Sequence, residues 1–525
     1  MGLPLIPAAA LCLLLALTVY RYIIHPAFVS PLAKAPNAHW TTPFTSAWIL
    51  YHRFIQKDTP TVHAAHQRLG SIVRLGPNEL SVNCVDGGIR TIYGGGYEKG
   101  DWYANIFSNY GVQPMFAMPD HSRHSKRKRM ISNVYAKSTL QGSETVAAIS
   151  KILLSERLIP RLEAIVASGK PIEVYDIFSS ATMDFVAAYA FGLKNGSNFL
   201  REPAYAAKFL KDYKARQMYT FWPQEMPNFT NFMSRVGLIN WIVPAWVGKA
   251  NKDIEAWIMA MCDRAEASLK LGSIAPADKP TVYAQLRNSL IKEASKTDLD
   301  AQVENIVKAH RLEMASEMVD HVLAGFDTSS ITLTWLAWEL SRPANAVWQQ
   351  TLRSEIASLR DMKDPKQVDA LPTLNALLME TLRIHTAIPG NQPRVTPASA
   401  SLGESADAIT DLPPGLRVQS QAWSLHRNPD IFPDPDSWRP ERWLDSSDAQ
   451  LKEMNRWFWA FGSGGRMCVG SNLAMLEMKA IMVAVWGSFR TQIVDDEGMV
   501  HNGGYLAEPI GKDGKFLVLS FEHVE

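Results

Sequence analysis

The N-terminus of the sequence is a long apolar run. From Leu3 to Tyr20 there is no charged side chain, leucine, alanine and isoleucine dominate, and Arg21 ends the run. About 20 apolar residues in a helix cross the hydrocarbon core of a bilayer. The pattern therefore predicts a single membrane anchor over residues 1–24.

A cleaved signal peptide is the alternative interpretation of this run. Such a peptide needs basic residues before the apolar core and a small-residue cleavage pattern after it, and the sequence has neither. The basic residues Arg21, Lys34 and Arg53 instead follow the span. By the positive-inside tendency, we expect the long C-terminal part to lie in the cytosol.

Prolines at short intervals follow the apolar run. They are Pro26, Pro31, Pro36 and Pro43. Because proline fixes φ and removes a backbone donor, the pattern predicts a stiff extended hinge over residues 25–45 rather than a helix.

The rest of the sequence, residues 46–525, has mostly helical spacing. Alternating apolar residues flank Gly76-Pro77 in the segment from Ile72 to Asn83, which predicts two short strands around a turn. No repeat or low-complexity tract divides the later segments. We expect one mainly helical domain with a minor sheet.

Aromatic residues and prolines are dense from Tyr219 to Val247. Two interpretations stay open at this point. The stretch is either a loop and helix of the core, or a second membrane contact, since tryptophan and tyrosine favour the headgroup interface.

Composition and charge exclude several classes. The chain has 525 residues, a formal charge of +1 and 20% charged residues, so it is neither disordered nor attracted as a whole to nucleic acid. Four scattered cysteines are too few for a disulfide framework, which favours a reducing compartment. Cys84 and Cys262 have the context of small buried hydrophobic residues.

Cys468 has a different context. It lies in the segment Phe461-Gly462-Ser463-Gly464-Gly465-Arg466-Met467-Cys468-Val469-Gly470, directly before a helical run. Glycines allow a tight turn, and the positive end of the following helix favours a thiolate. A thiolate shielded by the ring of Phe461 is a ligand for a soft or borderline metal, and Arg466 offers a fork suited to a carboxylate. The alternative to a metal ligand is that Cys468 is simply a cysteine at the start of an ordinary helix.

This segment resembles the haem-binding signature of the cytochrome P450 family, Phe-x-x-Gly-x-Arg-x-Cys-x-Gly, at every fixed position. The resemblance implies the cytochrome P450 fold after a single transmembrane helix, with haem b (iron protoporphyrin IX) bound at loop 461–470. Cys468 would be the axial thiolate ligand of the iron, and Phe461 and Arg466 would contact the cofactor.

A second segment, Ala324-Gly325-Phe326-Asp327-Thr328, lies in a long helical run. Gly325 weakens a helix, and Thr328 can bond a carbonyl one turn back, so a kinked core helix is one interpretation. The segment also resembles the family's oxygen-groove motif. By that resemblance Asp327 and Thr328 would be the pair that relays protons.

A third segment, Glu380-Thr381-Leu382-Arg383, carries an acid and a base on one helix face. It resembles the family's Glu-x-x-Arg pair, with Pro440-Glu441-Arg442-Trp443 as the partner segment and Trp443 where phenylalanine is usual. We expect Glu380, Arg383 and Arg442 to form a buried structural charge network.

The run from His121 to Arg129 is basic, and a solvated helix face is its default interpretation. In the family a His or Trp and an Arg four residues later bind haem propionates. His124 matches, Lys128 stands in the arginine's place, and Arg129 is a possible substitute. Arg394 matches the family's other propionate arginine. The remaining basic side chains would form a surface for an acidic electron donor.

The resemblance implies insertion of one oxygen atom from dioxygen into a lipophilic small molecule. Electrons would come from NADPH through the flavoprotein NADPH-cytochrome P450 reductase, with a cytochrome b-type protein as a second possible donor. The expected location is the endoplasmic reticulum membrane, in contact with membrane lipid and not with nucleic acid. A haem-thiolate isomerase or dehydratase and a non-catalytic haem sensor are the alternatives.

The resemblance also implies where the substrate binds. The pocket would be lined by the loop 102–118, the aromatic stretch near residue 220, Ala324 with Phe326, and residues 388–392, all mostly apolar. The anchor, the hinge and the divergent basic helix look most like fungal microsomal members, many of which act in secondary-metabolite biosynthesis.

Overall fold

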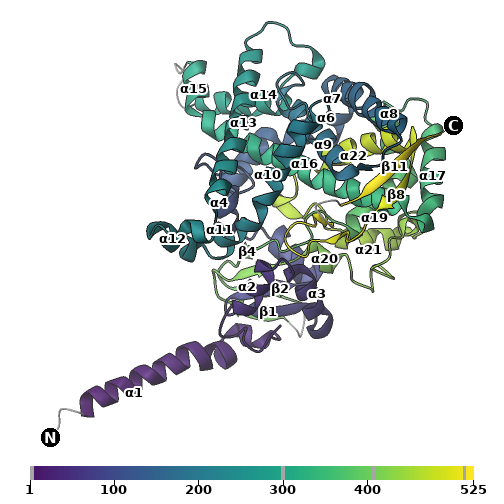
Figure 1. Cartoon of the computed structure of the whole chain (residues 1–525). Helices are drawn as coiled ribbons and strands as arrows, with labels where there is room; N and C mark the ends of the chain where they lie inside the picture. The colour runs from purple at the N-terminus through teal and green to yellow at the C-terminus, as the bar shows by residue number, and fades with distance from the viewer. Residues whose placement is uncertain (1–4, 297–301, 405–407, 512–515, 525) are drawn as a thin grey trace.

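The computed structural model describes residues 5–296, 302–404, 408–511 and 516–524. Within these ranges the chain is mainly helical with four small sheets, which confirms the predicted fold class (Figure 1). The α-helices are α1 (Leu5–Val19), α2 (Ala47–Phe54), α3 (Asp58–Leu69), α4 (Asp101–Phe107), α5 (His121–Ile131), α6 (Lys137–Gln141), α7 (Glu144–Ser150), α8 (Ile159–Ser168), α9 (Val174–Phe191), α10 (Pro203–Ala215), α11 (Phe221–Glu225), α12 (Pro227–Arg235), α13 (Ala245–Leu269), α14 (Thr281–Ala294), α15 (Val303–Ala309), α16 (Arg311–Ser341), α17 (Ala346–Ala357), α18 (Pro365–Asp369), α19 (Pro372–Ile384), α20 (Ala422–Leu425), α21 (Asp448–Trp457) and α22 (Ser471–Trp486). The strands are β1 (Ile72–Gly76), β2 (Glu79–Val82), β3 (Ile172–Glu173), β4 (Arg394–Val395), β5 (Ala400–Leu402), β6 (Ile409–Leu412), β7 (Arg417–Gln419), β8 (Phe489–Asp495), β9 (Val500–His501), β10 (Pro509–Ile510) and β11 (Val518–His523).

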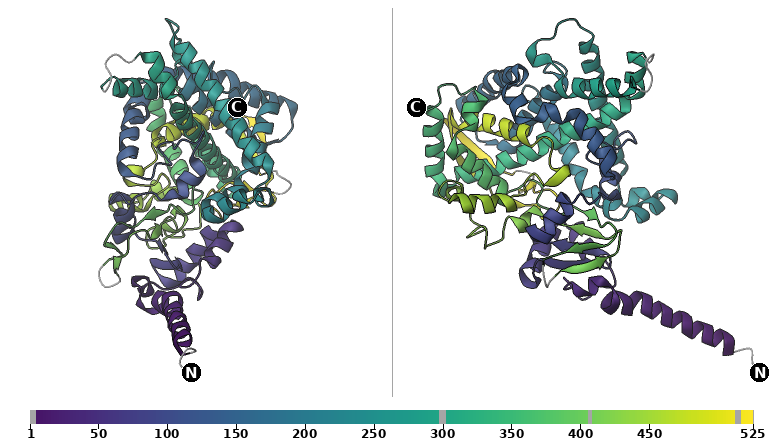
Figure 2. Two further views of the ribbon diagram at one scale, coloured as in Figure 1. Left: turned by 90° about the vertical axis from the view of Figure 1, so that its left-hand side faces the viewer. Right: turned by 180° about the vertical axis from the view of Figure 1, so that it is seen from behind.

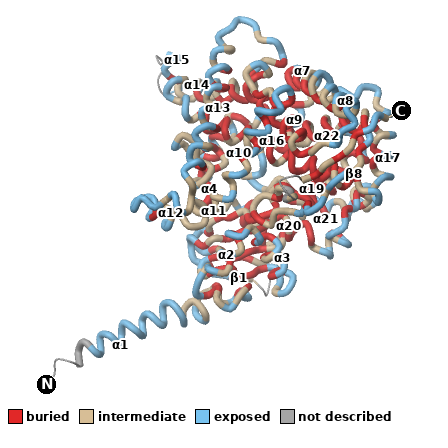
Figure 3. Tube along the Cα trace, viewed as in Figure 1, coloured by how far each residue is buried: buried red, intermediate tan, exposed pale blue. Residues whose placement is uncertain are grey.

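The predicted anchor is a helix that projects from the body of the protein (Figures 1 and 2). The segment Ala8–Val29 is long and apolar enough to span a membrane, and none of it is buried (Figure 3). Its leucines at positions 11, 13, 14, 15 and 17 are more than half exposed. Residues 1–4 of the predicted anchor lie outside the described ranges.

The predicted hinge is wrong in its first part. The helix does not end at residue 24, because α1 continues as the π-helix η1 (Tyr20–Val29), and Pro31 then begins the 3-10 helix η2 (Pro31–Lys34). The fixed φ of proline is itself compatible with a helix, and the π-helical turn around Pro26 continues although proline has no N–H to donate. Within the predicted hinge, only Ser30 and residues 35–45 lack regular helix.

The sheet nearest the anchor has the strand order β1-β2-β7-β4. Strands β1 and β2 are antiparallel, with Ile72 opposite Val82, and the chain turns at Gly76-Pro77 as predicted. This sheet lies beside α2 and α3 at the base of the anchor (Figure 1). A second sheet, β3-β11-β8, lies near the C-terminus.

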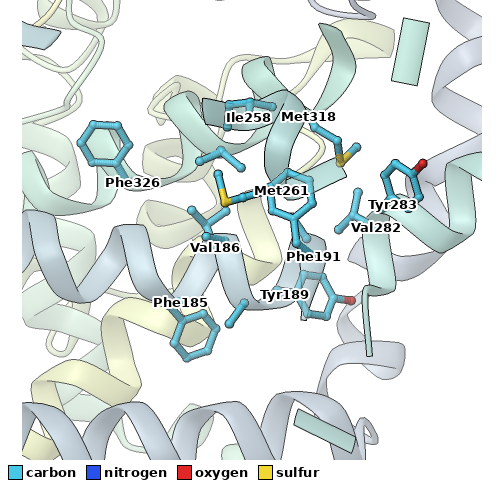
Figure 4. Close-up of a cluster of buried hydrophobic side chains, with 14 of the residues drawn as sticks. Phe185, Val186, Tyr189, Phe191, Ile258, Met261, Val282, Tyr283, Met318 and Phe326 are labelled. Carbon is cyan, nitrogen blue, oxygen red and sulfur yellow. The ribbon is translucent and has the colours of Figure 1, made fainter. Parts of the chain in front are cut away.

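Helix α16 is the central element of the larger core. It packs along α9, with α13 and α14 on the same cluster of buried side chains (Figure 4). An added Cβ at Gly325 would lie 2.7 Å from Cγ2 of Val186 on α9. Gly325 is therefore needed for close approach of two helices rather than for a kink, and α16 is one continuous helix.

The aromatic stretch 219–247 divides into two parts. Phe221 and Trp222 of α11 pack against Phe54 of α2, with ring centroids 5.3 and 5.8 Å apart. Beyond α11, Phe232 and Trp241 are 58% and 81% exposed. Exposure on this scale excludes the core interpretation for α12 and the turn that follows it.

Candidate functional site

Cys468 lies between the 3-10 helix η12 (Gly464–Arg466) and the first turn of α22. Its amide N–H donates to the carbonyl oxygen of Phe461 (3.0 Å) and closes the turn. Gly464 has a φ of +68°, and a Cβ there would lie 2.1 Å from the carbonyl oxygen of Tyr93. Only glycine fits at this position, so the tight turn predicted from the sequence is present.

The side chain of Cys468 lies deep in the protein and still has accessible surface, so its sulfur opens on an internal space. Burial raises the pKa of its thiol, while the N–H groups of Gly470 and Ser471 and the charge of Lys128 act to lower it. The helix start thus favours the thiolate as predicted, but burial outweighs it. A metal cation bonded to the sulfur would reverse that balance.

Lys128 has a different place from the one expected. Its Nζ donates to the carbonyl oxygens of Gly465 and Met467, at 3.0 Å each. The ammonium group therefore binds the cysteine loop. Because an ammonium is a compact point charge, it stabilises the loop and the sulfur rather than forming a bidentate pair.

Part of α16 is accessible although most of the helix is buried. Ala324 is exposed and Thr328 is partly exposed, although the flanking Val322 and Phe326 are buried. The hydroxyl of Thr328 donates to the carbonyl oxygen of Ala324 (2.9 Å), as expected from the sequence. Phe326 does not line the space, because its ring packs in the core against Tyr213.

Asp327 points away from the face that carries Thr328. Its Oδ2 accepts a hydrogen bond from the hydroxyl of Tyr213 (3.0 Å) and one from Nε2 of Gln217 (3.3 Å), both from the α10 region. Its Oδ1 is buried without a partner among the described residues. Burial raises the pKa of this carboxyl group, so the acid holds its proton more firmly than an exposed aspartate.

Four basic side chains gather at the edge of this space, on α5, the cysteine loop, β4 and the loop before α4. Besides burial, the charges of Lys99, Arg394 and Arg466 each lower the pKa of at least one other member of the group. Arg394 is buried, and its Nη1 donates to the hydroxyl of Tyr103 (2.9 Å). His124 is buried and its Nδ1 has no partner among the described residues. The four are Lys99, His124, Arg394 and Arg466.

Arg466 uses its fork differently from the expectation. Its Nη1 donates to the carbonyl oxygen of Met118 (2.6 Å), and its Nη2 donates to those of Pro119 and Asp120. It therefore joins the cysteine loop to the segment before α5. Arg129, considered as a substitute for Lys128, is exposed and lies outside the cluster.

Lys99 was missed by sequence analysis. It is 4% exposed, its Nζ donates to the carbonyl oxygen of Phe116 (2.6 Å), and it lies over the rings of Tyr103 and Phe116. Burial and the charges of Arg394 and Arg466 hold its pKa well below the usual range. A lysine just before the predicted pocket loop was its only signal in the sequence.

These observations fit a haem group. An accessible sulfur suits an axial bond to iron, and buried cations with no carboxylate partner in the cluster suit the two propionates. Among the residues that the structure describes, no group of three His, Cys, Asp or Glu side chains could hold a bare metal ion. A porphyrin supplies the ligands that such a site lacks.

The predicted structural network is confirmed. Glu380 accepts hydrogen bonds from Nε and Nη2 of Arg383 (2.9 and 2.8 Å), Nε of Arg442 (3.0 Å) and Nε1 of Trp443 (2.9 Å). These charges hold the pKa of Glu380 below its usual value despite burial. Trp443, which replaces the usual phenylalanine, adds a donor to the network.

A thiolate loop facing a threonine-bearing helix, with buried cations at its edge, characterises haem-thiolate proteins. The model of the family described as "Cytochrome P450" matches residues 41–505. The chain belongs to the cytochrome P450 family; it is a monooxygenase, and haem is its cofactor.

The chain is similar to several fungal proteins. It is 30% identical to the cytochrome P450 monooxygenase avaI of Aspergillus versicolor over 424 residues, which cover 78% of this chain and 93% of the relative. It is 24% identical to tpcC of Cochliobolus heterostrophus, over 92% of this chain and 88% of the relative. It is 25% identical to tazI of Aspergillus terreus, over 96% of each.

Proposed function

We propose that this monooxygenase inserts one oxygen atom from dioxygen into a lipophilic small molecule of fungal secondary metabolism. NADPH supplies the electrons through a flavoprotein reductase. The observation that carries the proposal is the accessible side chain of Cys468 deep in the protein, at the start of α22 and in the loop that Lys128 binds and that Arg466 joins to the segment before α5.

The chain's own residues divide the work of holding the cofactor. Cys468 binds the iron, with Lys128 and the first turn of α22 supporting the sulfur. His124, Arg394 and Lys99 bind the propionates, with Arg466 beside them and Phe461 next to the sulfur loop. Haem held in this way would supply dioxygen activation, to which the thiolate of Cys468 would contribute electron density.

Asp327 and Thr328 supply protons in this proposal. The hydroxyl of Thr328 is partly accessible and would exchange its bond to the carbonyl oxygen of Ala324 for one to a water molecule on that side of the helix. Asp327 keeps an unpartnered Oδ1, and its raised pKa suits a group that carries a proton. A rotation of Asp327 away from Tyr213 would connect the two residues.

The proposed location is the endoplasmic reticulum membrane, with one span and the catalytic domain in the cytosol. The exposed apolar residues after α11, chiefly Phe232 and Trp241, would rest on the same membrane surface. The exposed basic residues of α5, His121, Arg123 and Arg129, would receive the reductase or a cytochrome b-type donor.

The test combines a carbon monoxide difference spectrum with a measurement of NADPH consumption. Purified protein is reduced under carbon monoxide, and the thiolate-type Soret band is compared with that of Cys468→Ala, which should lose it. NADPH consumption is then measured with added reductase and dioxygen. A protein that stays colourless after haem supplementation would contradict the proposal.

The same assay separates the alternatives. An isomerase or dehydratase would keep the thiolate spectrum and convert substrate without NADPH. A haem sensor would keep the spectrum and consume neither NADPH nor substrate. The presence of both Asp327 and Thr328 favours the monooxygenase, because a rearrangement without dioxygen needs no proton relay.

A further inference from the structure

Asp320 extends the open face of α16 by one more turn. It precedes Ala324 by four residues and Thr328 by eight, so the three side chains follow one another at intervals of about one turn along the helix. Eight residues correspond to about 12 Å along the axis. Asp320 lies deep in the protein and is still partly accessible, whereas the neighbouring His321 and Val319 are buried.

The carboxylate of Asp320 has no hydrogen bond or ion pair with any residue that the structure describes. The other acids of α16 are paired: Glu317 accepts from the N–H of Met115 (3.0 Å), and Asp327 accepts from Tyr213. An unpaired carboxylate in the interior costs several kcal/mol relative to a paired one. Among the acids of α16, Asp320 is therefore the one whose hydrogen-bond or ion-pair partner would come from a ligand rather than from the protein.

The nearest basic groups are bound elsewhere. The ammonium of Lys99 donates to the carbonyl oxygen of Phe116 and lies against two aromatic rings. The ring of His321 is hydrogen-bonded to the hydroxyl of Tyr135 (2.6 Å) and to Glu317 (3.3 Å). Neither forms a hydrogen bond or an ion pair with Asp320, although the charges of both act on it.

Aromatic side chains complete the surroundings. The charge of Asp320 raises the pKa of Tyr505, which places that phenol within its electrostatic reach. The ring of Tyr505 packs edge-to-face on Trp102 (5.4 Å). A carboxylate near aromatic rings favours an organic cation over a neutral or acidic group.

We propose that Asp320 selects substrates that carry a protonated or quaternary amine, held about two helical turns from the carbon that is oxidised. The inference rests on the proposed function, because it assumes that Thr328 marks the site of oxidation. Burial and the charge of Glu317 raise the pKa of Asp320 to about 7, against the opposing charges of His321 and Lys99. A bound cation would release that proton, so the preference should strengthen as the pH rises through about 7.

The test uses decyltrimethylammonium and 1-decanol as probes on the purified full-length protein. The quaternary ammonium cannot coordinate iron, so its binding reports on the pocket alone. Isothermal titration calorimetry measures both dissociation constants. We expect the ammonium to bind at least tenfold more tightly than the alcohol. Decanoate should bind more weakly than either.

Matched variants separate charge from shape. Asp320→Asn should weaken ammonium binding at least tenfold and change decanol binding less than twofold, while Asp320→Glu should keep the preference. Asp430→Asn, at an exposed loop position, is the control and should change neither. An Asp320→Asn protein that keeps the wild-type preference, or a wild-type protein that prefers the alcohol or decanoate, would overturn the inference.

The two proposals fail in different ways. If the thiolate spectrum and NADPH consumption are normal but the ammonium has no advantage, only the assignment of Asp320 is wrong. If haem does not bind, the proposed function is wrong. Calorimetry still decides the role of Asp320 in that case, because it needs no haem signal.

Discussion

Replacing Glu380 by glutamine keeps the shape of the side chain and removes the charge that two buried arginines share. Arg383 and Glu380 are fully buried, and Arg442 is 7% exposed. Removing one partner of a buried ion pair costs about 3–5 kcal/mol, because the remaining charge stays buried without compensation. Arg383 keeps hydrogen bonds to the carbonyl oxygens of His426 and Pro435, which places the expected loss near the lower end, at about 3 kcal/mol.

An exposed pair in the same protein provides the control. Glu453 accepts two hydrogen bonds from Arg456 (3.1 and 2.8 Å), and both side chains are more than a third exposed. Glu453→Gln should cost less than about 1 kcal/mol, since water screens the pair. Both variants are compared by urea unfolding, followed by far-UV circular dichroism and by the haem spectrum.

The stability difference between wild type and Glu380→Gln should depend on pH in a definite direction. The pKa of Glu380 is lower in the folded protein than in the unfolded chain, so its contribution is complete above the unfolded pKa of about 4.5 and is lost as the pH falls through the folded value. The difference between wild type and Glu380→Gln should therefore be largest near neutral pH and shrink below about pH 4.5. A Glu380→Gln protein no less stable than Glu453→Gln at pH 7 would refute the reasoning.

Three further predictions concern packing, protonation and membrane binding. Gly325→Ala should destabilise the protein by about 1–3 kcal/mol, because the new methyl group meets Val186. Gly248→Ala on α13 has open space around it and should stabilise the protein by up to about 1 kcal/mol. Thermal unfolding of the two variants checks the difference in sign. Burial lowers the pKa of His66 to about 4, so His66 stays neutral in the folded protein, whereas in the unfolded chain it takes up a proton below about pH 6.5. The free energy of unfolding should therefore fall between about pH 6.5 and 4. His66→Gln should flatten that fall in urea titrations, and an unchanged slope would show that His66 does not cause it. Deleting residues 1–29 should move part of the protein from the membrane fraction to the soluble fraction, and adding Phe232→Ser with Trp241→Ser should move most of the rest. Flotation with liposomes measures both steps. A double substitution without effect would show that α12 and the turn after it do not contact the membrane.

The sequence predicted the features that depend on local pattern. The tight turn before Cys468, the strands around Gly76-Pro77, the bond from Thr328 and the network of Glu380 all depend on residues close in sequence or on a family motif. Each of these places strong local constraints on the backbone. The structure agrees with all of them.

What the sequence could not supply is the direction of side chains that contact distant segments. Lys128 was expected beside a propionate, but it reaches loop carbonyls more than 330 positions away in the sequence. Arg466 binds the carbonyls before α5 for the same reason. Lys99 carries no motif at all, because its role depends on burial near the charges of Arg394 and Arg466 from two other segments.

The two acids of α16 show why composition alone misjudged the pocket. Asp320 and Asp327 are seven residues apart, about two turns, and lie only about 20° apart around the helix axis, so local packing rather than helical phase gives them different surroundings. Asp327 is fixed by protein donors and suits proton transfer, whereas Asp320 has no hydrogen-bond partner among the described residues and suits recognition. If Asp320 lines the substrate pocket as proposed, its charge, rather than the apolar area of the lining, would distinguish one lipophilic substrate from another.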